Sequence, residues 1–231
     1  MFHPPVQLKS LEEQILAYER EPVETGKILF YGHSLFTRWG SPTWGYRRLD
    51  ADIRMKDGSL ACVNHGFGSA SSEEMLYYYD RMIRPWAPRA LVLMSLYNDD
   101  VYGMSVEQTL ANLQRICFWA RTDFPGIRFY FVEAHPHPLL IDTFLPGIPD
   151  SHNERLNRVK HYNEGLALYA HANEDAQVIR LWNRPELFET PEDTGNPHKF
   201  RKELFEDYIH YNQQGYDVFG AIVREALDDI L

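Results

Sequence analysis

The amino-acid sequence predicts an α/β protein built on a parallel β-sheet that helices cover on both faces. Five short apolar segments are expected to be buried strands, because polar residues do not alternate within them and turn-forming residues flank them. Amphipathic segments separate these runs, and that alternation is typical of a parallel sheet. The expected strands cover residues 27–31, 61–63, 90–94, 127–132 and 177–182.

Helices are expected before, between and after these strands. Apolar residues recur at helical spacing over the first twenty residues, until Pro22 and Gly26 end the pattern. The length suits one domain over residues 1–231, in which 1–26 forms an N-terminal helical extension. The other expected helices cover about 72–82, 105–122, 156–171 and 212–230.

Composition and charge exclude several classes of function. The net charge of −10 and the lack of a Lys/Arg cluster argue against a nucleic-acid partner, since phosphate binding requires clustered basic residues. No apolar run reaches about 18 residues, so no membrane span is expected. The N-terminal residues lack the basic and apolar regions of a signal peptide, which predicts a cytoplasmic protein.

Neither a metal nor another cofactor is expected. Cys62 and Cys117 lie in a strand-like and a helix-like segment, and we expect both to be small buried hydrophobic side chains. His135 and His137 flank one proline, with no helical i, i+4 spacing and no evident Cys or carboxylate partner. We place both histidines at the rim of a pocket, with a metal site as the alternative.

Residues capable of chemistry follow the predicted strands. In an open parallel sheet, ligands bind outside the carboxyl ends of the strands. The Pro-rich segment 183–209 is long and weakly periodic, and we expect it to form a wall or a lid of such a site. The residues that gather at this edge are Ser34, 64–69, Asn98, Asp99, His135, His137, Asp207 and His210.

Three of these residues form a complete set for nucleophilic catalysis. A serine hydroxyl requires a base within hydrogen-bond reach, and the base requires an orienting partner. His210 suits the base because its unperturbed pKa is about 6.5, and Asp207 can orient the ring and stabilise the imidazolium. Ser34, on a strand-to-helix turn, is the expected nucleophile.

The negative oxygen of a tetrahedral intermediate requires preorganised N–H donors. The candidates are the Ser34 N–H at a helix start, the Gly/Ser turn at 66–69 and the Asn98 amide. Structural roles compete with these assignments: Ser34 or Asp207 as a helix cap, and Asn98 with Asp99 as turn residues.

Four separated segments follow the predicted strands or precede the last helix. They are Gly32-His33-Ser34-Leu35, Val63-Asn64-His65-Gly66-Phe67-Gly68-Ser69, Leu96-Tyr97-Asn98-Asp99 and Asp207-Tyr208-Ile209-His210-Tyr211-Asn212. In this order they resemble the sequence blocks of the SGNH, or GDSL-type, hydrolases, and the resemblance extends from Lys27 to the C-terminus. It implies a flavodoxin-like three-layer α/β/α fold with five parallel strands in the order 2-1-3-4-5. It also implies ester hydrolysis through a covalent acyl-serine, without a metal.

Position by position, the resemblance assigns Ser34 as the nucleophile, His210 as the base and Asp207 as the acid. It assigns the oxyanion donors to the N–H of Ser34, the N–H of Ser69 and the side chain of Asn98.

Three positions depart from the family's usual pattern. His33 stands where the family has an Asp, which must change the local hydrogen bonding. Ser69 replaces an oxyanion glycine, although a backbone donor does not require glycine if the turn tolerates a Cβ. Leu96 replaces the glycine two residues before Asn98 and is expected to crowd the pocket floor.

The sequence therefore predicts a carboxyl-ester hydrolase that releases a short acyl group, such as acetyl, from a carbohydrate or another small molecule. No long apolar loop is present to line a lipid channel. The alternatives are acyl transfer to another hydroxyl, a lysophospholipase or thioesterase, and a catalytically silent binding module. Substrate contacts are expected from His33, Tyr97, His135 and His137.

Two features of the sequence leave more than one interpretation open. The N-terminal helix either covers the sheet edge or forms a contact in a homo-oligomer. The aromatic residues near the expected site either pack in the core or line the substrate pocket, where a ring can stack on a sugar. These aromatic residues are Trp39, Trp44, Tyr46, Tyr97 and Tyr102.

Overall fold

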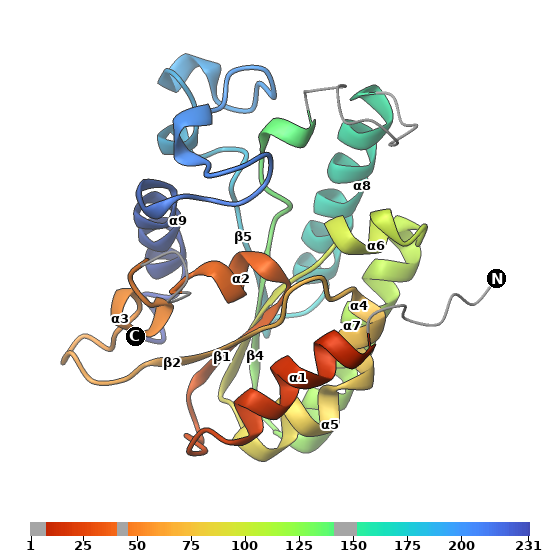
Figure 1. Ribbon diagram of the computed structural model, residues 1–231, viewed down its shortest axis with the longest axis vertical. Helices are drawn as coiled ribbons and strands as arrows, with labels where there is room; N and C mark the ends of the chain where they lie inside the picture. The colour runs from red at the N-terminus through yellow and green to blue at the C-terminus, as the bar shows by residue number, and fades with distance from the viewer. Residues whose placement is uncertain (1–7, 41–45, 141–151) are drawn as a thin grey trace.

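The computed structural model describes residues 8–40, 46–140 and 152–231, and Figure 1 shows its backbone. Five parallel strands form one sheet in the order β2-β1-β3-β4-β5. This confirms the expected fold class and strand order. The strands are β1 Ile28–Gly32, β2 Cys62–Gly66, β3 Ala90–Met94, β4 Arg128–Val132 and β5 Ala176–Ile179.

Alternate residues of each strand contact opposite layers of helices. In β1, Leu29 and Tyr31 belong to one buried cluster, while Ile28 and Phe30 belong to the other. All five residues of β1 and of β3 are buried, which explains why these strands are continuous apolar runs rather than alternating ones. The apolar character of the segments therefore follows from the burial of both faces.

One layer contains α1 Leu8–Glu19, α4 Ser72–Tyr77, α5 Tyr79–Met82, α7 Val106–Asp123 and α8 His152–His171. The other layer contains α2 Ser34–Arg38, α3 Leu49–Asp52 and α9 Gln213–Ala226. The helices predicted at both ends of the chain and between the strands are present, with shifted ends.

The helix expected over 72–82 is two helices. Tyr78 leaves the helical conformation, with φ −90° and ψ 5°, so α4 ends and α5 begins there. Tyr78 and Tyr79 are both buried, which places two consecutive rings against the core. The short helices α3 and α6, Tyr97–Val101, were not predicted, because four or five residues are too few to establish a periodicity.

Strand β5 ends at Ile179 rather than near residue 182. The buried Glu133 carboxylate accepts hydrogen bonds from the N–H groups of Leu181 and Trp182, at 2.7 and 3.2 Å. A side chain therefore takes the donors that a longer ladder would have used, and the chain turns away from the sheet.

The N-terminal helix α1 packs onto the same layer as α5, beside which it lies in Figure 1. Its apolar residues Leu11 and Ile15 are fully buried. Arg81 of α5 pairs with Glu12 at 2.8 Å and with Glu19 at 2.6 Å. These contacts make α1 part of the packed layer.

The segment 183–209 follows β5 and packs beside α9, at the upper left of Figure 1. Its large apolar side chains, including Leu187, Phe188, Phe200 and Leu204, are buried against α9. Short 3-10 turns carry it, at Pro185–Leu187, Pro191–Asp193 and Lys202–Leu204. Of the whole segment, only Ile209 lines the cleft beside Ser34, so the expected wall or lid of the site is limited to its last residue.

Cys62 and Cys117 are free and buried, as expected. Over the part of the chain that the structure describes, no helix has both the length and the apolar character needed to cross a membrane.

Candidate active site

Ser34 lies at the carboxyl end of β1 and is the first residue of α2. Two glycines allow α2 to approach the sheet closely. A Cβ on Gly32 would lie 2.6 Å from the Met94 carbonyl oxygen of β3 and 3.1 Å from the Phe36 ring of α2, and one on Gly66 would lie 2.5 Å from the Thr37 nitrogen of α2. The sharp turn that presents Ser34 therefore depends on both glycines.

A chain of hydrogen bonds joins Ser34, His210 and Asp207. Ser34 Oγ lies 2.8 Å from His210 Nε2, although the residues are 176 positions apart. His210 Nδ1 lies 2.8 Å from Asp207 Oδ2 and 3.0 Å from Oδ1. Because a carboxylate only accepts, Nδ1 carries the proton and the Nε2 lone pair faces the serine hydroxyl. This is the geometry of a general base.

The backbone of the loop orients the Asp207 carboxylate. Its Oδ1 accepts hydrogen bonds from the N–H groups of Ile209 and His210, at 2.9 and 2.8 Å. Burial opposes the charge, but these hydrogen bonds, together with the His210 ring, lower the pKa of Asp207 to about 2. Asp207 is therefore ionised at neutral pH and able to stabilise an imidazolium.

His210 is neutral at the start of any reaction near pH 7. Burial lowers its pKa below the usual range, Asp207 raises it, and the nearby Arg38 lowers it again, with a net decrease. A neutral imidazole can accept the proton of the Ser34 hydroxyl.

Ser34 lines a cleft of about 420 Å³. Ser69 and Asn98 line it together with Ser34, so the structure brings the three predicted oxyanion donors to one cavity. Asn98 Nδ2 donates one hydrogen bond to the Ala70 carbonyl at 2.8 Å, which orients the amide. An amide nitrogen has a second N–H to offer.

Asp99 is fully buried and connects the two segments that carry the candidate oxyanion donors Ser69 and Asn98. It accepts hydrogen bonds from the Ser72 N–H at 3.0 Å, from the Ser95 hydroxyl at 2.6 Å and from the Leu96 N–H at 3.3 Å. The Ser72 hydroxyl also donates to it. Asp99 therefore links the turn before α4 to the turn that carries Asn98.

Ser69 and Leu96 both occupy the left-handed region of backbone space, with φ of 66° and 117°. These are the two positions where the resemblance calls for glycine, and glycine alone adopts such conformations without steric cost. The structure therefore keeps the glycine-type turns although the side chains disfavour them.

Gln14 of α1 holds the turn beside Ser69, a role that no sequence motif indicated. Its Oε1 accepts from the Gly68 N–H at 2.7 Å, and its Nε2 lies 3.4 Å from the Gly68 carbonyl oxygen. On the other side, the Tyr102 hydroxyl donates to the Ser69 carbonyl at 3.1 Å. The N-terminal helix therefore supports the candidate oxyanion turn directly.

His33 lines the cleft and is only 2% exposed. Its Nδ1 accepts from the Leu35 N–H at 3.4 Å, so Nε2 carries the proton of the neutral ring. Burial, with His135 and His210 nearby, lowers the pKa of His33 to about 3. Tyr97 also lines the cleft, and its ring meets His33 edge-on at 5.9 Å.

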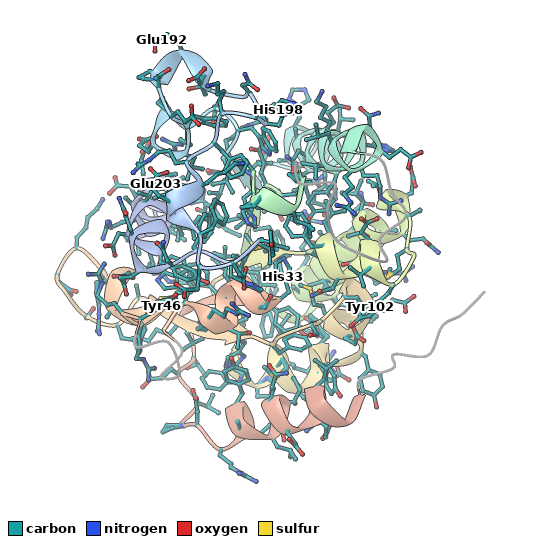
Figure 2. The ribbon with its side chains drawn as sticks, turned by 45° about the horizontal axis from the view of Figure 1, so that its top comes forward. His33, Tyr46, Tyr102, Glu192, His198 and Glu203 are labelled. Carbon is teal, nitrogen blue, oxygen red and sulfur yellow. The ribbon has the colours of Figure 1, made fainter. Side chains whose placement is uncertain are left out.

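In Figure 2, where the top of Figure 1 comes forward, His33 lies near the middle of the molecule. Tyr46 and Tyr102 lie to either side of it, whereas Glu192 lies at the outer edge of the view. The outermost part of segment 183–209 is therefore remote from His33, the residue beside Ser34.

His135 and His137 do not lie at the rim of the cleft, where the sequence placed them. Both are fully enclosed, at 0% and 1% exposure, and their rings lie edge-on to Tyr97 at 5.3 and 4.6 Å. They lie behind the cleft because the chain after β4 continues into the protein interior. Burial lowers the pKa of His135 to about 3 and holds that of His137 well below its usual range.

Of the other aromatic residues expected near the site, Trp39, Tyr46 and Tyr102 do not line the cleft. Trp39 is buried and stacks on Tyr216 at 5.6 Å, which is a packing role. The Tyr46 hydroxyl donates to Glu206 at 3.0 Å, next to Asp207. Trp44 lies outside the described residues. Among the residues that the structure describes, no group of three or more His, Cys, Asp or Glu side chains is placed to hold a metal ion.

A serine, a histidine and a carboxylate joined in this order form the constellation that serine hydrolases of unrelated folds share. A sequence profile of the GDSL-like lipase/acylhydrolase family matches residues 30–218, so the chain belongs to that family. A comparison with curated protein sequences gave no significant match.

Solved structures share the fold at low sequence identity. A GDSL-like lipase from Bacteroides thetaiotaomicron is 15% identical, with a TM-score of 0.71 over 96% of this chain and 99% of its own. An acetyl xylan esterase is 18% identical, with a TM-score of 0.64 over 87% and 99%. A lipase/acylhydrolase from Enterococcus faecalis is 16% identical, with a TM-score of 0.63 over 90% and 97%.

Proposed function

We propose that this protein is a serine-dependent carboxyl-ester hydrolase. The observation that carries the proposal is the hydrogen-bond chain from Ser34 through His210 to Asp207, at the floor of an open cleft. Membership of the acylhydrolase family agrees with it.

In the proposed reaction, Ser34 Oγ attacks the ester carbonyl while His210 Nε2 takes the hydroxyl proton. The negative oxygen of the tetrahedral intermediate accepts hydrogen bonds from the N–H groups of Ser34 and Ser69 and from the free N–H of Asn98. His210 then protonates the leaving alcohol. Water attacks the acyl-serine, with His210 again as base, and releases the acid.

The proposed substrate carries a short acyl group, such as acetyl, on a carbohydrate or a similar small molecule. The cleft supports this, because its volume of about 420 Å³ is small and polar residues such as Ser69, Asn98 and Arg38 line it. Segment 183–209 packs its large apolar side chains into the core, so they are unavailable to a long acyl chain. His33 and Tyr97 are the proposed substrate contacts.

The decisive comparison is wild type against Ser34→Ala on p-nitrophenyl acetate. We expect activity to fall by several orders of magnitude, as the loss of a triad nucleophile causes elsewhere. A serine-directed phosphonate should add its mass to wild type and leave Ser34→Ala unmodified. Equal activity in both proteins would reject Ser34 as nucleophile.

Two competing functions have separate outcomes. A series of p-nitrophenyl esters of increasing acyl length should show the highest kcat/KM at acetate. A maximum at a long acyl chain would favour a lysophospholipase or thioesterase. No turnover at any length, together with no phosphonate adduct, would favour a catalytically silent binding module. The departures from the family pattern at His33, Ser69 and Leu96 are the reason to consider that alternative.

A further inference from the structure

The loop that carries both Asp207 and His210 lies at the surface. Tyr208, between them, is 54% exposed, and the Asp207 side chain is 38% exposed. An antiparallel bridge between Phe205 and Tyr211 closes the loop at its base. Such an exposed turn requires further contacts if it is to hold the His210 ring within hydrogen-bond distance of Ser34.

Two buried histidines supply contacts to the backbone of this loop. His135 Nε2 lies 3.0 Å from the carbonyl oxygen of Ile209. His137 Nδ1 lies 3.3 Å from the carbonyl oxygen of Tyr208, which also accepts from the Leu139 N–H at 2.9 Å. The carbonyls of the two residues between Asp207 and His210 are therefore both held from the interior.

The chemistry of the acceptors determines the form of both rings. A carbonyl oxygen can only accept, so His135 must carry its proton on Nε2 and His137 on Nδ1. Burial keeps both imidazoles neutral, which is the state that these two tautomers require. Each ring is thus a donor aimed at one loop carbonyl.

The segment that carries the two histidines is itself firmly anchored. The Ala134 N–H donates to the Asn163 side chain at 2.9 Å, and the Trp182 indole donates to the Ala134 carbonyl at 2.6 Å. Arg155 donates to the Leu139 carbonyl at 3.0 Å. Contacts on both sides of the pair connect it to α8 and to the chain after β5.

The same segment contacts the oxyanion side of the cleft. The Tyr97 hydroxyl donates to the His135 carbonyl at 2.7 Å, and Tyr97 precedes Asn98 in α6. The His135 segment therefore touches both the acid–base loop and the helix that carries a candidate oxyanion donor.

We infer that His135 and His137 are positioning residues that hold the Asp207–His210 loop in register with Ser34 and Asn98. The inference rests on the proposed function and specifies how that site is assembled. Packing alone explains the two rings poorly. His135 Nδ1 and His137 Nε2 are buried without a protein partner among the described residues, a cost that an apolar side chain would avoid.

The amide side chains of Asn and Gln allow a reciprocal test. The Asn Nδ2 occupies roughly the place of the histidine Nδ1, and the Gln Nε2 roughly that of the histidine Nε2. His135→Gln and His137→Asn therefore retain the donor, whereas His135→Asn and His137→Gln misplace it. All four variants lose the ring. Gln is one methylene larger than Asn, but the donor-retaining variant is the larger member of the pair at 135 and the smaller one at 137, so size alone cannot produce the expected order in both pairs.

On p-nitrophenyl acetate, we expect kcat of His135→Asn and His137→Gln to fall about 10- to 100-fold with little change in KM, because small displacements of catalytic groups are costly. The donor-retaining variants should stay within a fewfold of wild type. Equal losses in both members of each pair, or no loss in any variant, would overturn the inference.

NMR tests the positioning without reference to activity. The His210 Nδ1–H in its hydrogen bond to Asp207 should give a protected downfield signal in wild type and in the donor-retaining variants. It should be lost in His135→Asn and His137→Gln. Retention of the signal in all four variants would count against positioning, even if the ester assays found no hydrolase.

A measurement on the wild-type protein covers the case in which the variants do not fold. Nitrogen-15 shifts of the rings should show the Nε2–H tautomer for His135 and the Nδ1–H tautomer for His137, both neutral and slow to exchange. The opposite tautomers, or rapid exchange, would overturn the inference. A protein with the expected tautomers but no phosphonate adduct would instead reject the proposed function and leave the positioning contacts intact.

Discussion

The guanidinium of Arg38 donates a 2.8 Å hydrogen bond to Asp207 Oδ2, the same oxygen that lies 2.8 Å from His210 Nδ1. Arg38 is the last residue of α2, the helix that Ser34 begins. The element that presents the candidate nucleophile therefore also holds the candidate acid.

Replacing Arg38 should change the pH dependence more than the maximal rate. Arg38 lowers the pKa of His210, so Arg38→Met should raise that pKa. Because the base must be neutral, the acid limb of the kcat/KM profile should move to higher pH. The maximal kcat/KM should fall by no more than about fivefold, since partly exposed ion pairs contribute about 0.2–1 kcal/mol.

A pH series on p-nitrophenyl acetate measures this shift. Arg184→Met is the control, because Arg184 forms a comparable ion pair with Glu225 far from the cleft. A profile for Arg38→Met that superimposes on the wild-type profile, or shifts to lower pH, would contradict the expected coupling.

Gln14 should matter for turnover although it lies in the N-terminal helix. Gln14→Leu removes the acceptor of the Gly68 N–H and should reduce kcat about two- to tenfold, the range that the loss of one hydrogen bond of about 0.5–1.5 kcal/mol predicts. Gln14→Glu keeps an acceptor for that N–H and should lose less. The exposed neighbour Glu13→Leu serves as control, and an equal effect there would show that α1 acts only through general stability.

Asp99 should be required for both stability and rate. In Asp99→Asn, one oxygen that accepts two hydrogen bonds becomes an amide donor, which leaves buried donors unpaired at a cost of about 1–3 kcal/mol. Tm should fall by roughly 2–12 °C in a protein of this length. kcat should fall as well, because the neighbouring residue Asn98 carries the amide that is a candidate oxyanion donor.

Asp100→Asn is the matched control for Asp99. Asp100 pairs with Arg158 at a partly exposed position, so its replacement should cost less than about 1 kcal/mol. Thermal unfolding with equal loss of Tm in the two variants would show that the network around Asp99 is not the cause.

The left-handed conformation of Leu96 predicts an unusual order of stability. Leu96→Ala and Leu96→Gly both lose a buried side chain, but only glycine relieves a backbone cost of about 1–3 kcal/mol at φ 117°. Leu96→Gly should therefore be the more stable of the two. Leu113 is buried within helix α7, and there the order should reverse. Leu113→Ala should be more stable than Leu113→Gly by about 1 kcal/mol, because glycine disfavours a helix.

Urea unfolding of the four variants measures both orders. A Leu96→Ala protein at least as stable as Leu96→Gly would mean that the turn does not strain the leucine.

The local sequence determined the strands, most of the longer helices and the identity of the candidate triad. Strands such as β1 are continuous apolar runs because both of their faces are buried, and this pattern is visible without coordinates. Ser34, Asp207 and His210 could be proposed because their motifs are short and each follows a predicted element. The order of the strands came from the resemblance to a family, since periodicity says nothing about which strands are neighbours.

The tertiary structure decided which distant groups support those residues. Gln14 meets Gly68 across 54 positions, and Arg38 meets Asp207 across 169. No local pattern encodes such contacts, because they depend on how the layers pack. The interior position of His135 and His137 has the same cause. Their residue types suggested a pocket rim, but the chain after β4 runs into the interior of the protein. The left-handed conformations of Ser69 and Leu96 likewise become visible only in three dimensions, because hydrogen bonds to Tyr102 and Asp99 hold turns that these side chains disfavour.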